Sequence, residues 1–277
     1  MQDQKVNYIN IGCGKKFHTS WENVDMVSHS AHVKKANLLK GIPYPSNSFD
    51  VVYHSQVLEH FPKDKAPHFI AECYRILKPG GTIRIVVPDL QNIIEEYQSH
   101  LKALQENPND ETAANYDWIM LELYDQTIRN SSGGLMVEYL RKDKHPNEPY
   151  LNQRMGFVGS KIKENANEGF TQKFKRVVAE MGILKFTSLV LGNFKNKMLG
   201  LLLGEKYRIG QFRLGGEIHY WMYDQYSLGK LLKDTGFSNI QVQNPHKSNI
   251  PNWGDYELDV KGEMVHDPTS LFMEASK

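Results

Sequence analysis

The feature that most constrains this chain is an apolar run over residues 8–11 that leads into the turn Gly12-Cys13-Gly14. Glycine is needed in such a turn because a Cβ would clash with a bound ligand or forbid positive φ values. A short strand that runs into a Gly-x-Gly turn brings the backbone against a nucleotide-like ligand. The turn alone is a weak signal, because ordinary strand ends share the pattern, and its meaning depends on the later elements of the chain.

Strand and helix patterns alternate after this turn. Residues 23–26 form a second short segment that contains Asp25, and residues 49–55 form a β-branched and aromatic run. Apolar residues at helical spacing over 69–77 end at a Lys-Pro-Gly-Gly turn, and another strand pattern covers 82–87. This alternation predicts an α/β fold with a doubly wound, mostly parallel sheet. At the end of its segment, Asp25 is placed to accept hydrogen bonds from both hydroxyls of a ribose.

Two later motifs make the pattern more specific. Residues 57–60 read Val-Leu-Glu-His, and residues 77–81 read Leu-Lys-Pro-Gly-Gly. With these motifs in this order, residues 8–90 resemble the class I S-adenosylmethionine-dependent methyltransferases, in particular the type 11 group. Residues 226–237 resemble the late helix of that family with its Gly-Phe stop, and residues 238–242 and 271–275 resemble its last two strands. The resemblance covers roughly half of the chain.

The resemblance implies a Rossmann-like sheet of seven strands with a large, mainly helical insertion after the fifth strand. It also implies S-adenosyl-L-methionine as the cofactor, bound outside the carboxyl ends of the strands. Where the family often has aspartate near the adenine, this chain has Asn37, which can both accept and donate a hydrogen bond. The expected cofactor-binding residues are Gly12, Cys13, Gly14, Asp25, Met26, Asn37, Leu38, His54 and Ser55.

Other cofactors fit the sequence less well. Phe17 stands where a nicotinamide fingerprint has its third glycine, and the chain has neither a P-loop motif nor a Gly-x-Ser-x-Gly motif. Cys13 and Cys73 are too few for a thiolate cage, and His54 and His60 lack i, i+4 spacing, so no metal site is predicted. Sparse cysteine and a first strand that begins close to Met1 favour a cytoplasmic location.

The sequence predicts a methyltransferase core over 1–90 and 217–277, interrupted by a basic, mainly helical insertion over 91–216. Helices are expected at 90–105, 112–129, 170–181 and 184–203. The net charge of the whole chain is +1, yet residues 154–213 carry twelve Lys and Arg against four acidic residues, a balance of +8. Such an insertion could attract a phosphate, a sugar diphosphate, an anionic lipid or nucleic acid. Nucleic acid ranks last, because aromatic residues do not alternate with the basic ones.

Only ten residues separate Gly14 from Asp25, so the first crossover helix is expected to be very short or replaced by a loop. The apolar stripe over 184–203 favours a helix buried against its own domain over one that lies on a membrane surface. Core packing is likewise favoured over contact with the sulfonium for Tyr8 and Tyr53.

Methyl transfer from a sulfonium depends mainly on alignment, and a base helps where the acceptor is a hydroxyl. The candidate bases are His60, which matches the family's histidine, Asp89, which follows the fifth strand, and His219. Strand-like alternation over 217–221 would put Glu217, His219 and Trp221 on one side, and His219 is the preferred acceptor-side residue.

The leading prediction is O-methylation of a small or medium polar acceptor such as a sugar or a carrier-linked glycan. The basic insertion motivates it, together with Tyr220, Trp221 and Tyr223, whose rings could stack on sugars. A membrane-surface methyltransferase of a lipid-like acceptor and a non-catalytic S-adenosylmethionine-binding protein are the alternatives. The acceptor and the oligomeric state are left open by the sequence.

Overall fold

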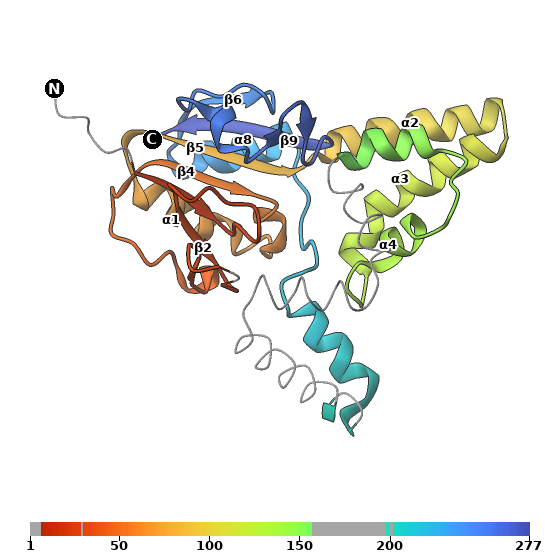
Figure 1. Cartoon of the computed structure of the whole chain (residues 1–277), viewed down its shortest axis with the longest axis horizontal. Coiled ribbons are helices and arrows are strands. Elements are labelled where there is room, and N and C mark those ends of the chain that lie inside the picture. Colours follow the sequence, from red (N-terminus) through yellow and green to blue (C-terminus); the bar gives the residue numbers. More distant parts are fainter. Residues whose placement is uncertain (1–6, 29, 157–197, 200–201) are drawn as a thin grey trace.

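The fold is built on one seven-stranded sheet with the strand order β3-β2-β1-β4-β5-β9-β6 (Figure 1). The computed structural model describes residues 7–28, 30–156, 198–199 and 202–277. All neighbouring strands from β3 to β5 are parallel, and β9 runs antiparallel to both β5 and β6. The strands are β1 (Tyr8–Ile11), β2 (Glu22–Asp25), β3 (Lys34–Lys35), β4 (Phe49–Ser55), β5 (Leu77–Pro88), β6 (Ser238–Gln243) and β9 (Ser270–Ser276). The predicted mostly parallel α/β sheet is confirmed.

Two helices, α1 (Ala66–Ile76) and α8 (Gln225–Thr235), pack on one face of this sheet. Phe69, Ile70 and Leu228 from these helices are buried in one large apolar core with β1, β4 and β5. Asp224 caps α8 by accepting a hydrogen bond from the backbone of Ser227, and Gly236 ends the helix with φ of +109°. The predicted late helix and its glycine stop are therefore present.

The opposite face is covered by irregular chain from near the C-terminus. The 3₁₀ turn η3 (Trp253–Tyr256) packs against Tyr8, Trp21 and Tyr53 on that face, and the small hairpin of β7 (Val260–Lys261) and β8 (Met264–Val265) follows it. The hydroxyl of Tyr53 donates a hydrogen bond to Asp259 Oδ1 at 2.7 Å. Both tyrosines thus belong to the core, as predicted, and Tyr53 already has a partner.

A fully buried arginine ties this irregular segment to the sheet. From β5, Arg84 donates to Asp259 Oδ2 and Glu274 Oε1, each at 2.7 Å, and to the carbonyls of Lys247 and Asn244. Its guanidinium also lies 4.7 Å from the centre of the Trp253 ring. Because the two carboxylates are buried as well, each charge in this group depends on the others for its partner.

The insertion begins directly after β5 with α2 (Leu90–Glu106), α3 (Asp110–Ile128) and α4 (Gly134–Leu140). These helices pack together beside the sheet rather than on it (Figure 1). They confirm the helices predicted at 90–105 and 112–129. Residues 202–213 are also helical, and the predicted helix at 170–181 and most of that at 184–203 lie outside the described residues.

Two segments are shaped differently from a standard strand-helix alternation. Residues 12–21 contain no helix, so a loop replaces the first crossover helix, which was one of the two expected outcomes. Residues 217–221 form no strand, which contradicts the predicted alternation. Their backbone bonds go to a 3₁₀ turn and a helix end instead: Tyr220 N donates to Glu59 O at 2.8 Å and His219 N to Gln126 O at 2.9 Å.

The buried arginine gives a stability prediction. Replacing Arg84 with Met would leave Asp259 and Glu274 buried without their cation, so we expect the free energy of unfolding to fall by about 3–5 kcal/mol. The matched control is Lys78→Met, which breaks the exposed Lys78–Asp50 ion pair and should cost less than about 1 kcal/mol. Urea denaturation measures both. Equal losses in the two variants would contradict the role given to Arg84.

Candidate functional site

The glycine turn after β1 has the backbone conformation that its sequence requires. Gly12 has φ of +66° and Gly14 has φ of +52°. A Cβ on Gly12 would lie 2.4 Å from a methyl group of Val57, whereas a Cβ on Gly14 would meet no protein atom within 4 Å. Gly12 therefore allows the turn to pack against the chain after β4, and Gly14 leaves an open approach to the backbone, as binding of a nucleotide-like group needs.

Asp25 at the end of β2 fastens this turn. Its Oδ2 accepts a hydrogen bond from Gly14 N at 2.8 Å, and its Oδ1 accepts one from Val27 N at 2.9 Å. Each carboxylate oxygen can accept a further bond, so the group remains able to bind two ribose hydroxyls. The neighbouring Met26 side chain is exposed. Burial raises the pKa of the Cys13 thiol to about 12, so Cys13 stays protonated and can contribute only as backbone and as packing.

The remaining predicted cofactor residues lie at neighbouring strand ends, with differing roles for their side chains. Asn37 Oδ1 accepts a hydrogen bond from Leu39 N at 3.0 Å as the cap of the turn η1 (Leu38–Lys40), so this capping competes with the adenine contact predicted for it. His54 is fully buried against Phe69, and burial lowers its pKa to about 3. Its ring faces the core, so only its backbone can line the ligand. Ser55 Oγ accepts a hydrogen bond from Lys16 at 3.4 Å.

These groups lie at one edge of the sheet, and their chemistry suits the predicted cofactor. The open side of Gly14, the carboxylate of Asp25 and the exposed Met26 are suited to the methionine, the ribose and the adenine. The structure brings these groups together at the ends of β1 and β2, where an open α/β sheet binds its ligands.

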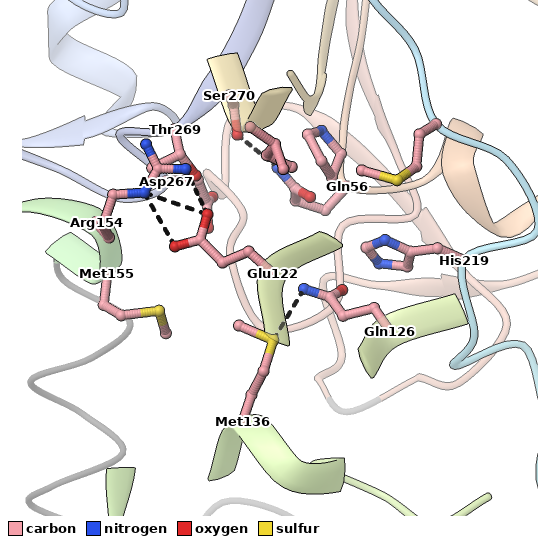
Figure 2. A pocket seen from close by; sticks show the side chains of 13 residues that line it. Gln56, Glu122, Gln126, Met136, Arg154, Met155, His219, Asp267, Thr269 and Ser270 are labelled. Atoms are coloured by element: carbon pink, nitrogen blue, oxygen red, sulfur yellow. Dashed lines mark hydrogen bonds and ion pairs between the residues drawn. The ribbon is translucent and has the colours of Figure 1, made fainter. Parts of the chain in front are cut away.

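A cavity of about 140 Å³ lies between the ends of β4 and β5 and the helices of the insertion (Figure 2). Gln56, directly after β4, has an unusual φ of +56°, and its side chain donates to Ser270 Oγ at 2.9 Å. A non-glycine residue in this conformation at a strand end is typical of a ligand site. The lining residues are Gln56, Pro88, Ile93, Glu122, Gln126, Met136, Arg154, Met155, His219, Met222, Asp267, Thr269 and Ser270.

The insertion contributes a buried ion pair to this cavity. Arg154 Nε donates to both oxygens of Glu122, at 3.0 and 3.2 Å, and Nη1 donates to Asn92 Oδ1 at 2.6 Å. The sequence gives no local sign of this pair, because the two residues are far apart and each reads as an ordinary charged residue of a helical region. Since Glu122 neutralises Arg154, this arginine is not an unpaired cation for an anionic ligand.

His60 and His219 are brought together, with their ring centres 4.8 Å apart. His219 lines the cavity and is buried, and this burial holds its pKa well below the usual range, so the imidazole is neutral at pH 7. Ile218 and His219 are both buried, whereas Tyr220 and Trp221 are both partly exposed. The predicted sidedness of residues 217–221 is therefore wrong, although His219 does reach the cavity.

Asp89 takes a structural position at the start of α2. Its Oδ1 accepts hydrogen bonds from Gln91 N and Asn92 N, at 3.0 and 3.4 Å, as the helix cap. It is not among the residues that line the cavity. The structure thus brings His60 and His219 together and leaves Asp89 apart from them.

The aromatic residues expected to stack on a sugar do not line this cavity. Tyr223 is buried in the large core, and Trp221 lies beneath Lys63, whose Nζ is 4.0 Å from the ring centre. Tyr220 instead borders a second hollow beside Leu38 and His60.

Within the part of the chain that the structure describes, no helix is both long enough and apolar enough to cross a membrane.

Residues 9–85 match the sequence model of a methyltransferase domain. An uncharacterized protein of Haemophilus influenzae is 30% identical over 106 residues, which is 31% of this chain and 42% of that protein. A probable S-adenosylmethionine-dependent methyltransferase of Mycolicibacterium smegmatis is 40% identical over 57 residues, 21% of each chain. The chain thus spans less than half the length of these curated relatives.

A solved S-adenosylmethionine-dependent methyltransferase from Thermotoga maritima aligns with 98% of this chain and 82% of its own length, at 12% identity and a TM-score of 0.38. Over residues 9–85, the domain match confirms the predicted resemblance to the class I S-adenosylmethionine-dependent methyltransferases. The cofactor of this class is S-adenosyl-L-methionine, as predicted.

The glycine turn gives a binding prediction. Gly14→Ala would put a methyl group on the open side of the turn, so we expect the affinity for S-adenosylhomocysteine to fall tenfold or more, about 1.4 kcal/mol. Gly80→Ala is the matched control, because Gly80 also has a positive φ and no neighbour at its Cβ position but lies far from the strand ends of the site. Isothermal calorimetry measures both. Equal affinities in the two variants would argue against a ligand at Gly14.

Proposed function

We propose that this chain is an S-adenosylmethionine-dependent methyltransferase that methylates a hydroxyl group of a small or medium polar acceptor, such as a sugar or a carrier-linked glycan. The observation that carries the proposal is the position of the cavity. It opens at the ends of β4 and β5, in the same sheet edge as the glycine turn and Asp25, so donor and acceptor would lie side by side.

The lining of the cavity favours a polar acceptor. Gln56 and Gln126 offer amide oxygens, while their amide nitrogens already donate to Ser270 and Met136, and Thr269 and Ser270 offer hydroxyls. An acceptor whose hydroxyl groups can replace water at these positions should bind more tightly, because buried polar groups left without partners are costly. Met136, Met155 and Met222 supply apolar surface on the insertion side, which suits the faces of a ring.

When bound, S-adenosylmethionine supplies an activated methyl group on a cationic sulfonium. The chain itself must then hold the donor, orient the acceptor and keep the reacting oxygen in line, and alignment of this kind contributes several kcal/mol. Gly12 to Gly14 and Asp25 would hold the donor. His219, neutral and at the cavity wall, is the residue best placed to accept a hydrogen bond or a proton from an acceptor hydroxyl.

The charge of the insertion supports an acceptor with a phosphate. The excess of basic residues over 154–213 would attract a sugar diphosphate or the phosphate of a lipid-linked glycan. Within the described part of this segment, Arg154 is paired with Glu122 and Arg213 donates to carbonyls at the end of α3. Attraction of an anionic carrier therefore depends on the remaining lysines and arginines.

The test is incubation of the protein with S-adenosylmethionine carrying a labelled methyl group and with cell extract separated into small molecules, glycans, lipids, RNA and protein. We expect label in the small-molecule or glycan fraction, in a base-stable ether linkage. His219→Gln should reduce this incorporation by about 10²-fold or more, without loss of donor affinity.

Label in the lipid fraction would favour the membrane-surface alternative, and label in RNA or protein would overturn the acceptor class. Donor binding with no methyl consumption in any fraction would indicate a non-catalytic binding protein. Absence of donor binding by the folded protein would overturn the proposal as a whole.

A further inference from the structure

Three groups beside the cavity form a cluster that methyl transfer alone does not explain. Glu59 and His60 belong to the 3₁₀ turn η2 (Leu58–His60), and His219 comes from the segment that rejoins the sheet after the insertion. One carboxylate oxygen and one nitrogen of each imidazole all lie within 4.8 Å of one another. The sequence gives no local sign of this cluster, because the spacing of His54 and His60 is not that of a metal site and His219 is far from both along the chain.

Glu59 is the unusual member. Its side chain is fully buried, and neither carboxylate oxygen has a hydrogen-bond partner among the described residues. The nearest cationic candidate is His60 Nε2, 4.0 Å from Oε1. Because a buried carboxyl group without a partner is costly, its position calls for a missing partner of positive charge.

The backbone at Glu59 is held in place by hydrogen bonds. Glu59 O accepts hydrogen bonds from Tyr220 N at 2.8 Å and from Trp221 N at 3.3 Å. The main chain is therefore held firmly while the carboxylate is left unpaired. The side chain points into the small space between η2 and the returning segment, where the two imidazoles also converge.

Both histidines are prepared to act as ligands. His60 Nδ1 lies 3.0 Å from Ile218 O, a carbonyl that can only accept, so this nitrogen carries the proton and Nε2 presents its lone pair. A ring nitrogen that donates to a backbone carbonyl while the other faces an ion is the usual arrangement of metal-binding histidines. His219 is buried, and one of its ring nitrogens faces the same small space.

The nearby positive charge is balanced. The guanidinium of Arg129 is close enough to interact with both His60 and His219. Its guanidinium is paired with Glu217 at 3.2 Å and also donates to Glu217 O at 3.0 Å. Among the described residues of this region, the carboxyl of Glu59 is thus the acidic group that lacks a partner, which favours a cation.

We infer that Glu59, His60 and His219 bind a divalent cation of the first transition row, such as Mn²⁺ or Zn²⁺, next to the acceptor cavity, which His219 lines. Two imidazoles and one carboxylate suit these ions better than Mg²⁺ or Ca²⁺, which prefer oxygen ligands. Ligand atoms about 2.1 Å from such an ion lie no more than about 4.2 Å apart, so the most distant pair, within 4.8 Å here, needs to close by at least about 0.6 Å on binding.

The role of the ion rests on the proposed function. His219 lines the cavity, so the open coordination positions would face the acceptor. An acceptor hydroxyl bound there becomes more acidic. Its oxygen forms the new O–C bond as the C–S bond of the donor breaks, the sulfur keeps the bonding electron pair, and the hydroxyl proton leaves to water. Under this inference His219 holds the ion instead of taking the proton.

The test measures ion binding without donor or acceptor, so that its outcome is separate from that of the proposed function. The full chain is stripped with EDTA and titrated with Mn²⁺, followed by the electron paramagnetic resonance signal of free Mn²⁺, with displacement by Zn²⁺. We expect one site per chain. Glu59→Gln and His219→Gln should each weaken Mn²⁺ binding by at least about tenfold. The control His246→Gln, at an exposed histidine, should bind as the wild type does.

Thermal unfolding distinguishes a variant that has lost the ion site from one that no longer folds. In EDTA, Glu59→Gln should be about as stable as the wild type, because it puts a neutral side chain of the same shape where the buried carboxyl has no partner. With Mn²⁺, only the wild type and His246→Gln should gain stability. The inference is overturned if the wild type binds neither ion at millimolar concentration, if Glu59→Gln or His219→Gln binds as tightly as the wild type, or if Glu59→Gln is clearly less stable in EDTA.

Discussion

The candidate site depends on how one short stretch of backbone, residues 217–221, is held between the core and the insertion. Tyr220 N and Trp221 N donate to Glu59 O after β4, and His219 N donates to Gln126 O near the end of α3. These bonds connect the sheet edge to the helices, and between them they set His219 beside His60 and against the cavity. They add to the direct connection of α2 to β5 and to the bond from Leu90 N to Tyr223 O in holding the insertion beside the strand ends.

The parts of the fold that could be predicted from the sequence are those that depend on local signals. The Gly-x-Gly turn, the β-branched run of β4 and the Gly236 stop each reflect a backbone preference of a few neighbouring residues, and each is present. The order of these signals indicated the parallel sheet and the cofactor, and the match of residues 9–85 to a methyltransferase domain agrees. The loop in place of the first crossover helix is one of the two outcomes that the ten-residue spacing predicted, the other being a very short helix.

The parts that could not be predicted are pairings between distant residues. The sequence around Glu122 does not predict its ion pair with Arg154, and the sequence around Arg84 does not predict its ion pair with Asp259. Tertiary packing brings each pair together. The alternation predicted over 217–221 was wrong since that segment satisfies its backbone bonds on a turn and a helix end, where side chains need not alternate. Of the predicted bases, His60 and His219 meet, whereas Asp89 caps α2. His54 is turned into the core by the strand that carries it.

The central claim is that the turn Gly12–Gly14 and Asp25 bind S-adenosylmethionine. Calorimetric titration of the folded chain with S-adenosylmethionine, beside the variant Asp25→Ala, tests it most directly. We predict binding at one site, with at least about a tenfold loss of affinity when the carboxylate at the end of β2 is removed. No binding by the folded wild-type chain, or equal binding by Asp25→Ala, would contradict it.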